Sequence, residues 1–204
     1  MIKRLSLTAI VIVLAACSSN PNEHKPSPLP LLPAKTEQVH VQKIKDLRIG
    51  KGLQANEVVP QLVTQNNTLY AASHNGVVIA VEANQGKQWQ QQTQLTITGL
   101  NVAYGRVALS GAKGEISLLD AQSGQLFWQK TLNAPILAAV AQTAERVIVQ
   151  TNDGKVYGLE AKTGNTIWVF DTPTASLSLR GYASPLIVGN TVIVAGATGK
   201  IFGL

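Results

Sequence analysis

The sequence has little cysteine, little charge and few large aromatic side chains. Its 204 residues include one cysteine, one methionine, three tryptophans, three phenylalanines, 17 basic residues and 11 acidic residues. A single cysteine excludes an internal disulfide, a CxxC redox pair and a zinc site built of thiolates. Because 45% of the residues are apolar, we expect a globular core of valine, isoleucine, leucine and alanine, a composition that favours strands.

Groups that carry chemistry are equally scarce. The net charge is +6, but no basic run alternates with stacking aromatics, so nucleic acid is not an expected partner. His24, His40 and His74 lack the spacing of a metal site. No Ser-His-Asp set, nucleotide loop or carboxylate pair stands out. We therefore predict no catalytic residue, no metal and no cofactor.

The cysteine ends a segment typical of exported proteins. Lys3 and Arg4 precede an apolar run that is too short to span a bilayer and suits a signal peptide. The tetrad LAAC, which ends at Cys17, resembles a bacterial lipobox and implies lipidation of Cys17. The alternative is a buried core cysteine behind a short helix. By resemblance to the sorting rule for lipoproteins, Ser18 in place of aspartate implies an outer-membrane anchor that faces the periplasm.

A proline-rich segment separates the cysteine from the rest of the chain. It holds five of the nine prolines, which predicts an extended tether rather than a sheet. The expected division is a signal peptide over residues 1–16, the lipidated cysteine and tether over 17–35, and a folded domain over 36–204.

The folded part is predicted to consist of repeats. Four stretches align column by column, beginning at Thr68, Arg106, Arg146 and Thr191. Each has a first glycine between two β-rich runs, and three continue into an acidic residue, an alanine, a second glycine and a tryptophan. The glycine and tryptophan columns are Gly76, Gly86 and Trp89; Gly114, Gly124 and Trp128; Gly154, Gly164 and Trp168; and Gly199.

Each column has a physical explanation. The first glycine suits a tight hairpin with positive φ, and the acidic-Ala-x-x-Gly stretch suits a turn whose carboxylate accepts backbone amides. The tryptophan ring would fill space between neighbouring sheets. Units of about 40 residues with three or four short strands are typical of propeller blades. We therefore predict an all-β propeller of four-stranded blades. The alternative is a β-sandwich, which would not repeat these residues at fixed offsets.

The repeat Gly-x-(Val/Ile)-x-x-(Leu/Val)-(Asp/Glu)-Ala-x-x-Gly-x-x-x-Trp resembles the PQQ-like repeat of quinoprotein alcohol dehydrogenases. One possible function is thus a quinone-dependent enzyme. Such enzymes hold calcium and quinone beneath a disulfide of adjacent cysteines, which one cysteine cannot form. Glu82, Asp120 and Glu160 stand at the turn position, where we expect them to cap turns.

A PQQ-like propeller on an outer-membrane lipid anchor resembles the BamB family of the β-barrel assembly machinery. That resemblance implies a non-catalytic scaffold that docks on the POTRA domains of BamA and assists the insertion of unfolded outer-membrane proteins. It also implies eight blades. A propeller lipoprotein that serves another envelope complex is the remaining alternative.

One loop bears on the partner. The interval from each tryptophan to the first glycine of the next repeat runs from 89 to 114, from 128 to 154 and from 168 to 199. The third interval is therefore longer than the other two by about five residues. Insertions in propellers become surface loops. The string LSLRG within this interval resembles the BamB segment that docks on POTRA domains, which implies partner-binding roles for Leu177, Leu179 and Arg180. Alternatively, the leucines fold back and Arg180 pairs locally.

The repeats also bear on the length of the chain. The fourth repeat reaches Leu204 at a point where the other three continue into the acidic turn. We expect about four blades, the last incomplete, and an N-terminal fragment of about half of the eight-bladed protein that the resemblance implies. The alternative is a four-bladed ring closed by residues 36–47.

Overall fold

A computed structural model describes a large part of the chain. The chain divides into two units, residues 1–46 and 47–204. In the first, Lys43 and Asp46 form an exposed ion pair of 2.7 Å. The residues described are 43, 46–47, 49–50, 62–82, 84–173, 183–196 and 198–204.

Several sequence predictions fall outside these residues. The signal peptide, Cys17, the tether and most of the segment proposed for ring closure are not among them. Leu177, Leu179 and Arg180 also lie outside the described residues. Within the part that is described, no helix is long and apolar enough to cross a membrane.

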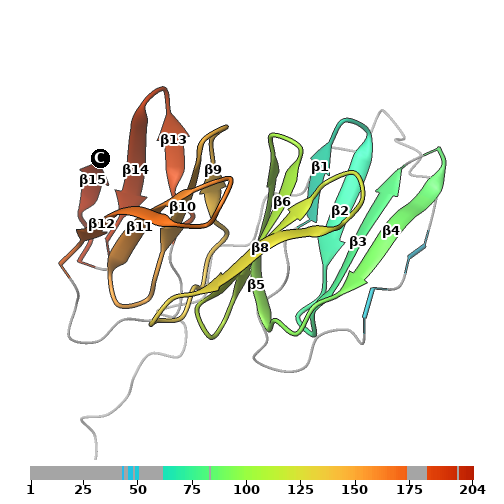
Figure 1. Ribbon diagram of the computed structural model, residues 1–204, viewed down its shortest axis with the longest axis horizontal. Coiled ribbons are helices and arrows are strands. Elements are labelled where there is room, and N and C mark those ends of the chain that lie inside the picture. Colours follow the sequence, from blue (N-terminus) through green and yellow to red (C-terminus); the bar gives the residue numbers. More distant parts are fainter. Residues whose placement is uncertain are drawn as a thin grey trace, which may run out of the picture. The chain divides into compact units, whose positions relative to one another are not determined.

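The described part of the second unit consists of strands in four antiparallel sheets, which we call blades 1 to 4 (Figure 1). Blades 1 to 3 have four strands each, and blade 4 has three among the described residues. Blade 1 comprises β1 (Leu62–Gln65), β2 (Thr68–Ala72), β3 (Val77–Glu82) and β4 (Gly86–Gln92). Blade 2 comprises β5 (Ile97–Ala103), β6 (Arg106–Gly111), β7 (Glu115–Asp120) and β8 (Leu126–Thr131). Blade 3 comprises β9 (Ala141–Gln142), β10 (Arg146–Gln150), β11 (Lys155–Glu160) and β12 (Thr166–Asp171), and blade 4 comprises β13 (Leu186–Val188), β14 (Thr191–Ala195) and β15 (Ile201–Gly203).

The strands of each blade follow one another in chain order, each antiparallel to the next. The first strands touch from blade to blade, β1 with β5, β5 with β9, and β9 with β13. The sheets thus succeed one another around a shared inner side, which is the arrangement of propeller blades. The predicted all-β propeller is confirmed.

Glycine forms the turns between strands. The first glycines, at 76, 114, 154 and 199, have φ between 79° and 89°, and the second glycines, at 86, 124 and 164, between 72° and 88°. Gly114 shows why no other residue fits: besides its φ of 88°, an added Cβ would run into the backbone carbonyl oxygens of Leu132 and Ala134.

The core lies between the blades rather than within one of them. Leu118 and Leu119 are both fully buried, but alternation along β7 directs them to opposite faces. Leu119 belongs to the cluster shared with blade 1, and Leu118 to the cluster shared with blade 3. Because each middle sheet is covered on both faces, its central strands carry continuous apolar runs.

Candidate functional site

The tryptophan column joins each blade to the next. The indole Nε1 of Trp89, on β4, donates a 2.9 Å hydrogen bond to the carbonyl oxygen of Ala121. Trp128, on β8, makes the same 2.9 Å bond to Ala161. Both rings are more than nine-tenths buried. The two acceptors are the alanines of the acidic-Ala-x-x-Gly turns, so each tryptophan binds the turn of the following blade.

The second glycine of each turn gives the ring its place. A Cβ at Gly124 would lie 2.7 Å from the ring of Trp89, and a Cβ at Gly164 would lie 2.8 Å from the ring of Trp128. No side chain fits at that separation, so the glycine permits the turn to lie against the indole face. The glycine and tryptophan columns of the repeat are therefore two halves of one inter-blade joint.

The acidic column stabilises the same turns. Asp120 accepts hydrogen bonds from the backbone N–H and the hydroxyl of Ser123, each at 2.7 Å. The Ser123 hydroxyl, together with the backbone amides of Ser123 and Gln122, holds the pKa of Asp120 below its ordinary value. Among the described residues, Glu160 accepts from the hydroxyl of Thr163, and Glu82 accepts from the side-chain amides of Gln85 and Gln88. The expected bond from carboxylate to backbone amide is thus present at Asp120.

The acids do not converge. They belong to turns of three different blades, and the described residues hold no group of three His, Cys, Asp or Glu side chains that could bind a metal ion. Their bonding partners are local donors within a few residues. These residues therefore do not fit the calcium and quinone site that the likeness to quinoproteins raises. The predicted capping of a turn by a carboxylate is confirmed at Asp120.

Trp168 differs from the other two tryptophans. It is only half-buried, and it borders an apolar groove of about 590 Å³ between blades 3 and 4. Phe170, Ile187, Val192 and Leu204 also line this groove. Nearby, the rings of Phe170 and Phe202 meet edge to face with centroids 5.8 Å apart.

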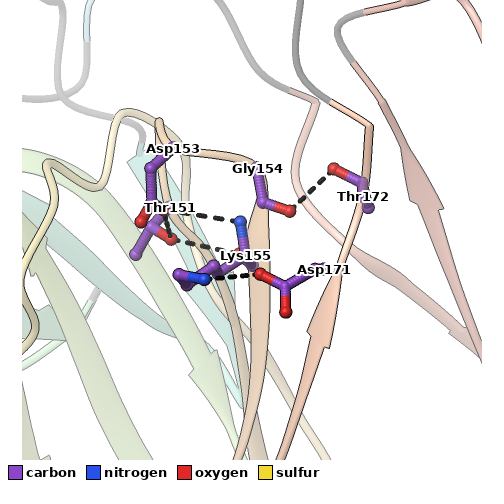
Figure 2. A network of polar contacts seen from close by, with 6 residues as sticks. All are labelled: Thr151, Asp153, Gly154, Lys155, Asp171 and Thr172. Carbon is purple, nitrogen blue, oxygen red and sulfur yellow. Dashed lines mark hydrogen bonds and ion pairs between the residues drawn. The ribbon is translucent and has the colours of Figure 1, made fainter.

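A polar network fixes the chain just before the predicted docking loop (Figure 2). Thr172 is buried, and both its backbone N–H, at 2.8 Å, and its hydroxyl, at 2.7 Å, donate to the carbonyl oxygen of Gly154. Asp171 pairs with the ammonium of Lys155, and Thr151 donates to Asp153 in the same hairpin. The described chain stops at residue 173 and resumes at 183, so the network marks one end of the interval that contains Leu177, Leu179 and Arg180.

The ion pair between Lys155 and Asp171 is exposed, but it shifts the pKa of Lys155. The carboxylate of Asp171 raises the pKa of Lys155, mainly through the hydrogen bond and then through charge attraction.

Arg106 joins blade 2 to blade 3, a contact that the sequence did not predict. Its guanidinium donates to the carbonyl oxygens of Thr143 and Ala144 in the next blade, and its Cζ lies 5.8 Å from the ring centroid of Tyr104. Partial burial lowers the pKa of Arg106. The one sequence signal for this contact is in the repeat alignment, where Arg106 places a long basic side chain in the column that holds Thr68 in the first repeat.

Comparison with known proteins decides the family. The family model described as outer membrane protein assembly factor BamB matches residues 88–204, which is more than half of the chain. The chain belongs to the BamB family. BamB from Yersinia pestis is 24% identical over 204 residues, covering 94% of this chain and 52% of its own length. The chain spans about half the length of the curated relatives that it matches most fully.

Solved structures agree with the assignment to the BamB family. The crystal structure of BamB from Moraxella catarrhalis is 30% identical and superposes with a TM-score of 0.67 over 71% of this chain and 45% of that chain. The quinohemoprotein alcohol dehydrogenase ADHIIG from Pseudomonas putida HK5 superposes with a TM-score of 0.56 at 17% identity, over 72% of this chain and 29% of that chain. This second likeness shows the shared propeller fold alone.

Proposed function

We propose that this protein is a non-catalytic scaffold lipoprotein of the outer-membrane β-barrel assembly complex. Its propeller docks on the POTRA domains of BamA and assists the assembly and insertion of β-barrel proteins. The observation that carries the proposal is the family match over residues 88–204 on a propeller. The local hydrogen bonds of Glu82, Asp120 and Glu160, each within its own turn or hairpin, support a scaffold rather than an enzyme.

The docking element in this proposal is the segment around Leu177, Leu179 and Arg180. It falls in the widest interval between the described strands of successive blades: β12 ends at Asp171 and β13 begins at Leu186, whereas β4 ends at Gln92 with β5 from Ile97, and β8 ends at Thr131 with β9 from Ala141. Long connections on a rigid scaffold carry binding residues more often than the strands do. The Thr172 anchor supports this role, because a loop with a fixed root loses less conformational entropy when it binds.

Attachment to the membrane is the second part of the proposal. Cys17 carries the lipid after cleavage behind residue 16, and the proline-rich tether holds the propeller on the periplasmic side of the outer membrane. One acyl chain gives only reversible binding, whereas two give stable attachment. Metabolic labelling with an alkyne fatty acid tests this directly: the parent is expected to take up label, and Cys17→Ser is expected to take up none.

Binding to isolated POTRA domains tests the docking segment. Leu179→Asp and Arg180→Glu are expected to weaken binding at least tenfold, because the first removes an apolar anchor and the second reverses a charge. Lys113→Glu, in an exposed hairpin of blade 2, is the matched charge control and is expected to bind like the parent. Unchanged affinity for both loop variants would remove the segment from the interface.

The two rival functions have their own readouts. Dye reduction that depends on added pyrroloquinoline quinone would reveal a quinone enzyme, the alternative that the PQQ-like repeat raises. Crosslinking in cells followed by pull-down separates the assembly complex from any other envelope complex. Recovery of BamA supports the proposal, and its absence among the crosslinked proteins contradicts it.

A further inference from the structure

A pocket of about 660 Å³ lies between blades 1 and 2, at the end of the sheets where their acidic turns stand. Thr68, Glu82, Tyr104 and Asp120 are among its lining residues, and we call it the acidic pocket. The described residues that line it include two carboxylates and no basic side chain. A cleft lined by charge of one sign attracts the opposite charge, so this pocket favours a cationic group.

The next two blades place an arginine at the position that borders the acidic pocket in blade 1. Thr68 stands in the repeat column that holds Arg106 in blade 2 and Arg146 in blade 3. In each blade the residue of this column lies opposite the acidic residue of the turn, across the antiparallel pair of central strands. The opposite pairs are Arg106 with Asp120, Arg146 with Glu160, and Thr68 with Glu82. Because opposite residues are near neighbours, Glu82 lacks the basic neighbour that the other two acids have.

Arg106 shows that a guanidinium is held at the equivalent place between blades 2 and 3. Its two terminal nitrogens donate to the carbonyl oxygens of Thr143 and Ala144, in the first hairpin of blade 3. Tyr104 and Gly105 form the corresponding hairpin of blade 2, and both line the acidic pocket. Arg106 itself is not among the lining residues of that pocket. The fold therefore uses an arginine between neighbouring blades at this position, and between blades 1 and 2 the chain supplies only a short threonine.

The carboxylates of the acidic pocket have room for a stronger donor. Glu82 accepts hydrogen bonds of 3.4 Å from the neutral amides of Gln85 and Gln88. Bonds from a charged donor to a carboxylate are shorter and roughly twice as strong. The hydroxyl of Ser123 lowers the pKa of Asp120, so this second carboxylate is ionised at neutral pH. An incoming cation thus meets two negative charges.

A guanidinium suits this lining better than a metal ion or an ammonium group does. The described residues hold no group of three His, Cys, Asp or Glu side chains that could bind a metal ion. Glu82 and Asp120 belong to the turns of two different blades. A guanidinium presents five donors in a planar fork and is able to serve two separate acceptors, whereas an ammonium group is a compact point charge that is strongly hydrated.

We propose that the acidic pocket binds an arginine side chain presented by a partner protein. The guanidinium donates to the carboxylates of Glu82 and Asp120 and fills the space that Thr68 leaves between the blades. This inference goes beyond the docking on POTRA domains and does not depend on it. The pocket belongs to blades 1 and 2, whereas the docking segment lies between blades 3 and 4.

NMR titration of the purified full chain at fixed ionic strength tests this inference. The probe is a capped peptide in which one arginine is flanked on each side by serine and glycine. Its controls carry citrulline, which keeps the shape and removes the charge, or lysine, which keeps the charge and removes the fork. Saturable shifts of the amide signals of Glu82 and Asp120 are expected with arginine, with at least tenfold weaker binding for either control. Absence of saturation, or equal binding of the arginine peptide and either control peptide, would overturn the proposal.

A matched pair of neutralised acids assigns the binding to the pocket. Glu82→Gln is expected to weaken binding of the arginine peptide at least fivefold. Glu115→Gln removes the same charge from blade 2 at a residue that does not line the pocket, and it is expected to bind like the parent. Equal weakening by both variants would show that only net charge matters and would overturn the proposal.

A second pair of variants fills the pocket from within the chain. Thr68→Arg installs the residue of blade 2 opposite Glu82 and is expected to abolish saturable binding of the peptide. Thr131→Arg adds the same residue at an exposed position of β8, opposite Glu115, and is expected to bind like the parent. Full binding by folded Thr68→Arg would overturn the proposal, and if that variant does not fold, the glutamate pair decides. Leu179→Asp should bind the peptide like the parent, which keeps this outcome separate from that of the POTRA measurement.

Discussion

The indole N–H of Trp128 in blade 2 donates to the carbonyl oxygen of Ala161 in blade 3, and the same ring lies against Gly164. Trp89 repeats this relationship with Ala121 and Gly124 one blade earlier. Stability in such an array depends largely on the interfaces between nearest neighbours. The joint is thus a site where a single substitution weakens the contact between two blades.

Trp128→Phe is expected to lower the free energy of unfolding by about 1–3 kcal/mol, because it leaves the buried carbonyl of Ala161 without its donor. Urea denaturation followed by far-UV circular dichroism measures the change. Trp168→Phe, at the half-buried third tryptophan, is the matched control and should cost less. Equal losses would show that ring volume matters and the hydrogen bond does not.

Gly164→Ala is expected to destabilise the protein more than Gly189→Ala. Both glycines have positive φ, at 75° and 58°, so each alanine incurs backbone strain of about 1–2 kcal/mol. Only at Gly164 does the added Cβ also meet a ring, whereas nothing lies within 4 Å of a Cβ at Gly189. The difference in thermal unfolding should correspond to at least about 1 kcal/mol. Identical midpoints would contradict the steric role of Gly164.

Ser123→Ala is expected to raise the pKa of Asp120 toward its ordinary value, because the hydroxyl is the largest cause of the depression. A depressed pKa contributes stability above the ordinary pKa of aspartate, and this contribution is lost as the pH falls through the lower value in the folded state. Carboxyl-carbon NMR titration measures the shift. Thr163→Ala, at the equivalent turn of blade 3, should leave the titration of Asp120 unchanged.

Asp171→Asn is expected to bring the raised pKa of Lys155 back toward its ordinary value. The ion pair contributes fully below the ordinary lysine pKa, and its contribution disappears as the pH rises through the raised value. NMR titration of the Lys155 side chain reports the change. Asp153→Asn removes a weaker influence and should shift the lysine less. The reverse order would show that the hairpin, rather than Asp171, controls Lys155.

Local patterns predicted the fold because each blade repeats its turns. A tight hairpin turn needs a residue with positive φ, and the glycines at 76 and 114 were predicted to supply it. The structure gives both a positive φ near 89°. The strands followed from short β-branched runs between such glycines. A resemblance in the repeat then sufficed to indicate blades, since few folds use the same turn at a fixed interval.

Contacts between blades were harder to predict because they join residues far apart in the chain. The sequence indicated that Trp89 fills space between sheets, but not that its acceptor is Ala121. Arg106 likewise finds its carbonyl partners 37 and 38 residues later.

The environments of the tryptophans make blade 3 optically distinguishable from blades 1 and 2. Blades 1 and 2 each place one indole in a dry, hydrogen-bonded site, whereas the indole of blade 3 is half-buried. Emission from Trp89 and Trp128 should therefore lie at shorter wavelength than emission from Trp168. In variants that each retain a single tryptophan, the fluorescence of that tryptophan would report the opening of its own joint when a partner or a denaturant is added, without any added dye.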